Sequence, residues 1–478
     1  MKPLPKRSAA ILKTYPAVDG NYVRELLAQA VRNDPHKIIV LDDDPTGTQT
    51  VHDISVYTDW SYESISRGFR EDNKMFYLLT NSRGLTAEQS GQVHREIGAM
   101  LARVAGEQQR DYLIVSRSDS TLRGHYPLET IILAEDWARY LGQSVDGEIL
   151  CPYFKAGGRF TIDNIHYVQY GDVLVPAGET EFAQDKTFGY QSSDLTAYIE
   201  EKSQGAYQKE RVVTISLPEL RALKLEAIVD KLMGVTGFGK VVVNAIDACD
   251  VQVFCIALYR AIAQGKHFLF RTAAGFVKEL GAIADKPLLT REDMITNFDG
   301  IGGLVVVGSH TQKTTGQVEQ LKTLAGLQFI EFNSDLVLDE ERFAEEIAAV
   351  VRQEEELLAR GDTVVVYTKR KLLTLVNDSR EEALARSVKI SAAVQALVSR
   401  LKVTPAFVVA KGGITSSDIA TRALQIKQAQ VLGQIRPGIP VWQTGAESKF
   451  PHIPYIVFPG NVGERGTLKE VVEILLAK

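Results

Sequence analysis

The sequence predicts an α/β protein of two domains, each with a mainly parallel sheet flanked by helices, and a ligand cleft between the domains. The length of 478 residues is typical of two to three domains. Short apolar runs recur along the chain without alternation, as in parallel strands that are buried on both faces. Each run is followed by glycine or a polar turn and then by a segment of helical periodicity, which is the pattern of α/β layers.

The expected strands are these apolar runs. They lie at Ile38–Leu41, Met75–Leu79, Tyr112–Val115, Val241–Asn244, Leu304–Val307, Thr363–Tyr367 and Ala406–Ala410. The expected helices are the segments between them in which apolar residues recur at helical spacing. They lie at Ala87–Val104, Leu128–Leu141, Val251–Gln264, Glu340–Arg360 and Arg380–Leu401.

Two series of strands and helices divide the chain. We expect an N-terminal domain over residues 1–285, a linker over residues 286–300 and a C-terminal domain over residues 301–478. The linker contains Pro287 and several charges but has no strong periodicity. Within the first series, residues 152–189 form a long excursion that contains glycines and aromatic residues, and loops of this length are usually functional or disordered.

Composition excludes several classes of protein. Lysine and arginine number 54 against 60 aspartates and glutamates, a net charge of −6, so no basic field would attract nucleic acid or an anionic membrane. The 3 cysteines are too scattered for a disulfide framework or a four-ligand zinc site. No apolar run approaches the roughly 20 residues of a membrane span, and the N-terminus lacks the apolar region of a signal peptide. We expect a cytoplasmic protein whose partners are small molecules, with a homo-oligomer possible.

Consecutive carboxylates, Asp42–Asp44, directly follow the first expected strand. Such carboxylates repel one another, and holding them together is costly unless a cation or hydroxyl donors share them. Gly47 permits a tight turn, and neighbouring threonines supply short donors. A solvated acidic turn that caps a helix is the alternative. Because ligands bind beyond the carboxyl ends of strands in α/β sheets, this position favours a functional role.

The strand Tyr112–Val115 is followed by a second polar cluster. Its members are Arg117, Asp119, Ser120, Thr121, Arg123 and His125. Arginines suit bidentate recognition of a carboxylate or phosphate, while aspartate and hydroxyl groups suit a polyol, so the mixture favours an anionic, hydroxylated ligand over a charged surface turn. The excursion adds Arg159 and His166, although a lone histidine is more often a structural residue.

Glycine turns follow expected strands in the C-terminal half. They are Gly308-Ser309-His310, Gly412-Gly413-Ile414-Thr415 and, after the last apparent strand, Gly460-Asn461. A glycine turn at a helix N-terminus presents free N–H groups and the positive end of the helix dipole, which together hold phosphate. Purely structural turns are the alternative. The stretch 234–241 nearly matches a P-loop, but Val241 stands where Ser or Thr must reach Mg²⁺.

Taken together, these motifs resemble the four-carbon acid sugar kinase family, which includes threonate, erythronate and 3-oxo-tetronate kinases. The resemblance covers nearly the whole chain and rests on the order and spacing of several segments. They are Asp43–Gly47, Asp119–Gly124, Gly158-Arg159, His166–Val168, Thr180–Phe182, Gly308-Ser309, Gly412–Ser416 and Pro437–Pro440. The chain departs from the family pattern at Pro45, His310 and Val462.

The resemblance implies a transferase that uses ATP and Mg²⁺ to phosphorylate a hydroxyl of a small sugar acid in carbohydrate-acid catabolism. The N-terminal domain would bind the acid and the C-terminal domain the nucleotide. The expected catalytic residues are Asp44 and Asp43. The expected substrate-binding residues are Arg117, Asp119, Ser120, Arg123, Arg159 and His166. The expected nucleotide-binding residues are Ser309, Gly412, Gly413, Ile414, Thr415, Gly460 and Asn461, and no residue is assigned to the metal.

Two alternative functions remain at this point. A non-catalytic sensor that closes on a sugar acid would explain the arginines but would leave the C-terminal glycine turns without a purpose. An acid-sugar dehydrogenase would need a dinucleotide fingerprint, and no GxGxxG follows the first strand. Turnover of ATP with an aldonate distinguishes the kinase from both.

Overall fold

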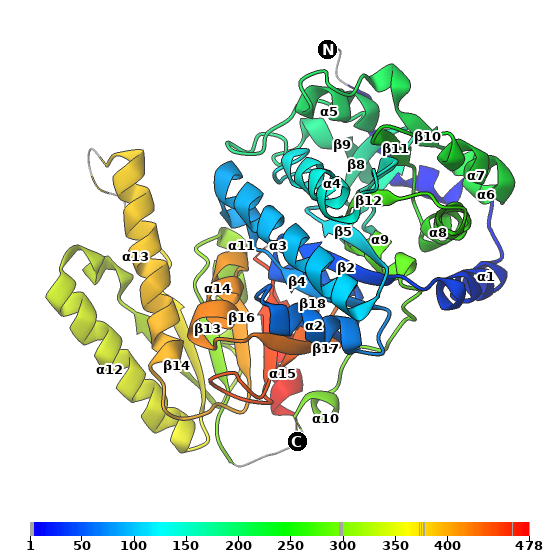
Figure 1. The fold of residues 1–478 in the computed structure, drawn as a ribbon. Coiled ribbons are helices and arrows are strands. Elements are labelled where there is room, and N and C mark those ends of the chain that lie inside the picture. The colour runs from blue at the N-terminus through cyan, green and yellow to red at the C-terminus, as the bar shows by residue number, and fades with distance from the viewer. Residues whose placement is uncertain are drawn as a thin grey trace. The chain divides into compact units, whose positions relative to one another are not determined.

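The structure is a computed structural model that describes residues 4–295, 300–371, 373, 375, 378–460 and 462–477. The part of the chain so described forms two compact units. Unit 1 consists of Met1–Gly47 and Asp59–Asp285, and unit 2 of Thr48–Thr58 and Lys286–Lys478. Both units have sheets covered by helices, which confirms the predicted α/β class (Figure 1). Residues 296–299 of the expected linker lie outside the described residues.

The main sheet of unit 1 is parallel throughout its described strands. Their order is β10 (Val213–Ile215), β11 (Gly239–Val243), β6 (Gly147–Cys151), β12 (Phe268–Thr272), β5 (Tyr112–Arg117), β2 (Lys37–Asp42) and β4 (Met75–Leu79). Every residue of β2 and β5 is buried, as expected for strands covered on both faces.

Helices follow the strands of unit 1. They are α1 (Gly20–Asn33), α2 (Tyr62–Arg70), α3 (Ala87–Gln108), α4 (Leu128–Leu141), α5 (Leu195–Lys202), α6 (Leu217–Arg221), α7 (Leu225–Met233), α8 (Ala248–Ala263) and α9 (Ala274–Leu280). Helices α2, α3 and α4 pack side by side, and α8 packs against α1, α7 and α9 (Figure 1). A capping box fixes the start of α3: the Thr86 hydroxyl accepts from Gln89 N, and the Gln89 side chain accepts from Thr86 N.

The excursion at residues 152–189 contains regular structure. Strands β7 (Arg159–Ile162), β8 (Ile165–Tyr170) and β9 (Val173–Pro176) form antiparallel pairs, and β1 (Arg7–Ser8) adds to β9. Tight turns join the strands, so successive segments pair locally instead of wandering as a loop. This small sheet presents Arg159 and His166.

The sheet of unit 2 is mixed. Its order is β3 (Ile54–Tyr57), β17 (Gln428–Arg436), β18 (Ile439–Thr444), β19 (Pro454–Phe458), β16 (Val408–Lys411), β13 (Leu304–Val307), β15 (Thr363–Thr368) and β14 (Leu327–Phe332). The strands from β19 to β14 are parallel, whereas β3, β17 and β18 pair antiparallel. Strand β3 therefore joins unit 2 although it precedes most of unit 1 in sequence, with Ile54 opposite Val431.

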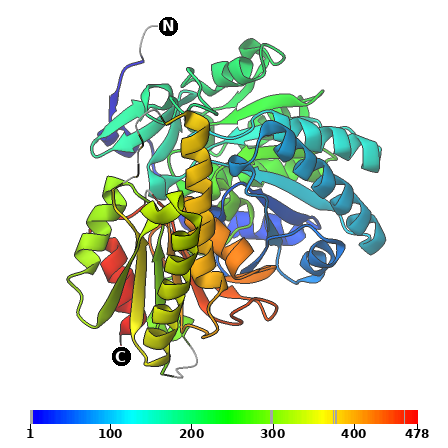
Figure 2. The ribbon, with the colours of Figure 1, turned by 90° about the vertical axis from the view of Figure 1, so that its left-hand side faces the viewer.

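The helices of unit 2 form two groups. They are α10 (Arg291–Met294), α11 (Gln312–Leu321), α12 (Glu340–Ala359), α13 (Arg380–Ser399), α14 (Gly413–Asp418) and α15 (Thr467–Leu476). Helices α11 and α15 pack together over alternate strand residues such as Val305 and Val307, and share one core with them. Figure 2 shows α12 and α13 side by side over the sheet. Within the described parts of the chain, every helix is too short or too polar to cross a membrane.

Candidate functional site

The carboxyl ends of neighbouring parallel strands bring the predicted site residues of unit 1 together. The strands β12, β5, β2 and β4 are adjacent, and their register places Arg117 beside both Asp42 and Thr272. Asp43 and Asp44 follow β2 directly. The acidic turn and the polar cluster after β5, which are far apart in sequence, therefore meet at one edge of the sheet.

Arg117 is buried beneath the acidic turn. Its Nη2 pairs with Asp42 Oδ1, donates to the Asp44 carbonyl at 2.6 Å, and lies 3.4 Å from Asp43 Oδ1. The same guanidinium fills the space next to Gly47, where a Cβ would overlap it, which explains the need for glycine there. Its Nη2 is thus committed to carboxylates of this chain, and its expected contact with a substrate carboxylate stays a prediction.

Arg83, which the sequence analysis did not single out, is a second organiser of the acidic turn. It lies in the turn after β4, and its Nη2 is 3.0 Å from Asp43 Oδ1 and 3.3 Å from Asp44 Oδ2. Its Nη1 is 4.0 Å from Asp119 Oδ1. Arg83 therefore links the carboxylates after β2 to the one after β5. Its position after an apolar strand was the one signal in the sequence that could have identified it.

The environment moves the pKa values of these carboxyl groups in different directions. Burial raises the pKa of Asp42, and the charge of Arg117 opposes that effect. Burial alone would also raise the pKa of Asp44, but the charges of Arg83 and Arg117 and hydrogen bonds from Thr46 outweigh it and hold the pKa below its ordinary value. Asp44 is consequently ionised near neutral pH.

Asp119 connects Arg83 with Arg123. Arg123 Nε donates to Asp119 Oδ2 at 2.6 Å, and Arg123 Nη1 is 4.0 Å from Asp185 Oδ2. Although burial opposes it, the charges of Arg83 and Arg123 hold the pKa of Asp119 far below its ordinary value. This carboxylate therefore serves as a fixed negative anchor for the arginine next to it.

The aromatic ring of Phe182 brings Arg123 and Arg159 close to each other. Their guanidinium carbons lie 5.1 and 5.5 Å from its centroid. Among the described residues, no carboxylate forms an ion pair with Arg159; its Nη1 donates to the Gly157 carbonyl, and its buried Nε has no hydrogen-bond partner. Burial lowers the pKa of Arg159, and the charge of Asp119 opposes that effect only in part. Arg159 is thus available to an anionic ligand.

A small hollow opens beside Asp119. Its lining consists of Ser118, Asp119, Leu122, Leu150, Pro152, Tyr198, Arg271 and Thr272. Arg271, also missed in the sequence, is held by Glu129 and by Ser116 Oγ at 2.9 Å. Gly124 has φ +128°, and a Cβ there would lie 2.5 Å from Arg271 Nη2 and 3.8 Å from Asp43 Oδ2. The hollow therefore combines a cation, a carboxylate and hydroxyl groups.

His166 and Ser120 contact each other through a backbone atom. The His166 ring is fully buried, with Nε2 2.8 Å from the Ser120 carbonyl and Nδ1 3.0 Å from Thr161 Oγ1. Burial lowers the pKa of His166 to about 4, so the ring is neutral at physiological pH. This geometry holds the loop after β5 against β8, while the expected contact of His166 with substrate stays a prediction.

In unit 2 the glycine turns after β13, β16 and β19 also meet. The three strands are neighbours, with β16 between the other two. A Cβ on Gly308 would overlap Thr415 Oγ1, and a Cβ on Gly460 would lie 3.8 Å from Gly413 N. Gly412 has φ +128°, which disfavours other residues there. The turns thus lie in contact at the carboxyl end of the sheet.

The remaining predicted nucleotide-binding residues differ in setting. Ser309 Oγ is 3.4 Å from Thr311 Oγ1 and accepts from Thr314 Oγ1 at 3.2 Å, so it helps to start α11. Ile414 is 74% exposed, an unusual state for a large apolar side chain beside a turn. Asn461 lies outside the described residues.

Two further cations, which were not among the predicted nucleotide-binding residues, hold these turns. Arg370 donates from Nη2 to the Ser309 carbonyl and lies 3.1 Å from Thr315 Oγ1. Lys411 is fully buried, and its Nζ donates to the carbonyl of Pro459 at 2.6 Å. The turns are therefore fixed by side chains as well as by their glycines.

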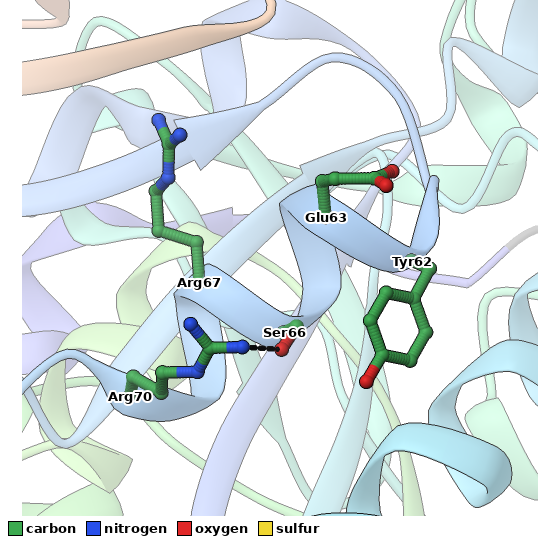
Figure 3. A pocket seen from close by; sticks show the side chains of 5 residues that line it. All are labelled: Tyr62, Glu63, Ser66, Arg67 and Arg70. Atoms are coloured by element: carbon green, nitrogen blue, oxygen red, sulfur yellow. Dashed lines mark hydrogen bonds between the residues drawn. The ribbon is translucent and has the colours of Figure 1, made fainter.

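Another hollow lies away from the predicted site residues. It is formed by α2 alone, between Tyr62, Glu63, Ser66, Arg67 and Arg70, with Arg70 donating to Ser66 Oγ at 2.6 Å (Figure 3). Within the described residues there is no group of at least three His, Cys, Asp or Glu side chains arranged to hold a metal ion. A Mg²⁺ ion that arrives as part of MgATP needs few protein ligands, because phosphates and water supply most of them.

Comparison with known proteins gives the class of protein. A family model described as "Sugar-binding N-terminal domain" matches residues 38–280, and one described as "Nucleotide-binding C-terminal domain" matches residues 304–468. The chain belongs to the family defined by these two domains, the architecture of the four-carbon acid sugar kinases that the sequence resembles. No curated protein matches the sequence at a significant level.

Solved structures support the same fold. A Haemophilus influenzae protein, assigned to a domain family of unknown function, has a TM-score of 0.60 at 16% identity, over 92% of this chain and 100% of its own. A protein of Salmonella typhimurium LT2 has a TM-score of 0.63 at 16% identity, over 91% of this chain and 98% of its own. At such low identity the likeness concerns the fold alone.

Proposed function

We propose that this protein transfers the terminal phosphoryl group of MgATP to a hydroxyl of a small sugar acid. The acceptor would be a four-carbon aldonate, an oxo-tetronate or a related branched oxo-acid. The observation that carries the proposal is the cluster of carboxylates and guanidinium groups at the carboxyl ends of β2, β4 and β5, within the residues that match a sugar-binding domain. Such a cluster suits a ligand that carries both an anion and hydroxyl groups.

The carboxylate of the acid would bind Arg159 and Arg123. Arg159 has no ion-pair partner among the described residues. Arg123 also lies against the Phe182 ring, and its Nε donates to Asp119. Two guanidinium groups beside one aromatic ring provide hydrogen-bond donors that match a planar carboxylate. The ring also limits the access of water to that carboxylate.

The reacting hydroxyl would be held by Asp44 or Asp43. Asp44 is the more accessible, with its side chain 20% exposed, and it is kept ionised by Arg83. Among the described residues, Asp43 Oδ2 has no hydrogen-bond partner. In the reaction the hydroxyl oxygen attacks the γ-phosphorus, the bond to the β–γ bridging oxygen breaks, ADP leaves, and the hydroxyl proton passes to the carboxylate and then to water.

The phosphates of MgATP would bind the glycine turns of unit 2. The glycines at 308, 412 and 460 let the turns pack closely against one another and put no side chain between an anion and the backbone N–H groups of the turns. Phosphoryl transfer needs positioning and charge neutralisation more than covalent chemistry, and these turns supply both without a dedicated side chain. Matching of this unit to a nucleotide-binding domain supports the assignment.

ADP release, measured in a coupled assay with a panel of acceptors, tests the proposal. Tetronates, oxo-tetronates and branched oxo-acids are the candidate substrates, and the matching uncharged polyols are the controls. We expect ADP release with at least one acid and none with its polyol. A sugar acid that binds in calorimetry but is never phosphorylated would instead support a sensor, and hydride transfer to a nicotinamide would support a dehydrogenase.

A further inference from the structure

Lys411 is the last residue of β16 and lies directly beneath the glycine turns of unit 2. Its side chain is fully buried. Its ammonium donates to the carbonyls of Pro459 and Gly460 at 2.6 and 3.3 Å and lies 4.1 Å from the centroid of the Phe458 ring. A residue of β16 therefore holds the turn that follows β19.

No carboxylate among the described residues compensates this ammonium. Among the described residues none forms an ion pair with Lys411, and the charged group that acts on it is another cation, Lys313 on α11. The elements packed against β16 bring few other titratable groups. Strand β13 contributes none and is followed by His310, β19 contributes Tyr455, whose hydroxyl donates to Ser416, and α14 contributes Asp418, which accepts from Ser391. A buried cation without a counter-charge is costly.

We propose that Lys411 positions the Gly460 turn against the Gly412-Gly413 turn and takes up a proton when the phosphates of a nucleotide bind there. This inference rests on the proposed function. A bound polyanion supplies the negative charge that the protein leaves out, so it favours the ammonium over the neutral amine. The charged form also donates to the carbonyls of Pro459 and Gly460, and these bonds hold the Gly460 turn in place for the ligand.

The sign of the effect follows from the pKa of the free protein. Burial and, to a smaller extent, the charge of Lys313 lower the pKa of Lys411 to about 7. At pH 8 a lysine with that pKa is about nine-tenths neutral, whereas at pH 6 it is about nine-tenths charged. Nucleotide binding at pH 8 is therefore expected to take up most of one proton, and binding at pH 6 very little.

Calorimetric titration of the full chain with MgATP measures this proton directly. At each of pH 6 and pH 8 the titration is run in two buffers that differ in ionisation enthalpy, and the difference in heat gives the number of protons taken up. ATP itself is fully ionised at pH 8, so the uptake there belongs to the protein. We expect more than half a proton at pH 8.

Variants assign the proton to this residue. Lys411→Arg keeps a charge that does not titrate in this range and is expected to abolish the uptake at pH 8. Lys411→Met removes both the charge and the two hydrogen bonds. It is expected to lower the affinity for MgATP at least tenfold at pH 6 without changing the affinity for the sugar acid. Lys322→Arg is the matched control, because Lys322 also lies in unit 2 but donates to the Tyr367 hydroxyl. The proton uptake of this variant on MgATP binding should equal that of the wild type.

The outcomes are distinct. Binding of MgATP to the wild type without proton uptake, or uptake that persists in Lys411→Arg, would overturn this inference and leave the proposed function intact. Absence of MgATP binding to the wild type would overturn both. If the variants fail to fold, the wild type decides: above pH 7 its dissociation constant for MgATP should rise about tenfold per pH unit, and a flat profile would contradict the proposal.

Discussion

The candidate sites of the two units hold positive charge differently. In unit 1 the guanidinium of Arg83 lies 3.0 and 3.3 Å from two carboxylates, and that of Arg117 is paired with Asp42. In unit 2 Lys411 faces carbonyl groups, and no carboxylate among the described residues pairs with it. Apart from Arg159, the arginines of the first site are paired with carboxylates before any ligand arrives, whereas in the second site no carboxylate among the described residues pairs with Lys411. Removal of a paired charge should therefore lower the stability of unit 1, whereas removal of the Lys411 charge should weaken nucleotide binding to unit 2.

The largest expected effect is on catalysis in unit 1. Asp44→Asn should lower the rate of phosphorylation by about 10²–10⁴, because it removes a general base, and should leave ATP affinity nearly unchanged. The asparagine side-chain oxygen can still accept from Thr46 N, as the Asp44 carboxylate does at 2.8 Å, so the turn should persist. Single-turnover kinetics measures the rate. Turnover within a few-fold of the wild type would move the role to Asp43.

A charge removed from the paired cluster should destabilise the fold. Arg117→Met leaves the Asp42 carboxylate buried without its partner, and losses of this kind cost about 3–5 kcal/mol. Urea unfolding measures the change in free energy. The matched control is Arg260→Ala, which breaks the exposed pair with Glu226 and should change stability by less than about 1 kcal/mol. Equal effects of the two changes would contradict the comparison between compensated and uncompensated charges.

The complementary change in unit 2 should affect a ligand more than the fold. Gly413→Val places a branched side chain at the first residue of α14, next to the Gly460 turn. The affinity for ATP should therefore fall at least tenfold, while the affinity for the sugar acid stays the same. Separate calorimetric titrations with each ligand check this, after a melting curve. In Gly316→Ala, the control, the added Cβ meets only ordinary contacts 3.5 Å or more away, so ATP affinity should not change. Unchanged ATP affinity in folded Gly413→Val would place the nucleotide elsewhere.

A smaller effect is expected from a substitution that keeps the positive charge but changes the shape of the group that carries it. Arg123→Lys retains the cation beside Asp119 but loses the planar fork, so the KM for the acid should rise by about tenfold and the KM for ATP should not. Steady-state kinetics with each substrate varied in turn measures both constants. Were both to stay at their wild-type values, Arg123 would serve only to hold Asp119.

The smallest expected effect is on the pH dependence of stability in unit 1. The pKa of His166 is lowered by burial to about 4, so the unfolded chain binds a proton more readily than the folded one. The contribution of neutral His166 is fully present above pH 6.5 and is lost as the pH falls towards 4. Between pH 7 and pH 5 the wild type should lose about 1–2 kcal/mol more stability than His166→Gln. The titration of Asp42 contributes equally to both proteins and cancels in this difference. If stability fell equally with pH in the wild type and in His166→Gln, the effect would not come from His166.

Local patterns were enough to predict the class of fold. The apolar runs Met75–Leu79 and Leu304–Val307 and the periodic segment Leu128–Leu141 are strands and a helix with those bounds. Strand β17 was not predicted because its buried and partly buried residues alternate, whereas the predicted strands are continuous apolar runs. The excursion was expected to be a loop because its strands are short and form a small sheet of their own, apart from the main sheet of unit 1.

The sequence by itself determined which strands end in carboxylates and glycines, since both depend on neighbours in the chain. It could not show that Arg83, 40 residues beyond Asp43, lies against that carboxylate, or that Lys411 holds the carbonyl of Pro459, 48 residues away. Those contacts depend on strand order and register, which arise only when distant segments pack into one sheet. Tertiary structure therefore decided which charges are neutralised within the protein and which are left for a ligand, because charge compensation acts through space and not along the chain.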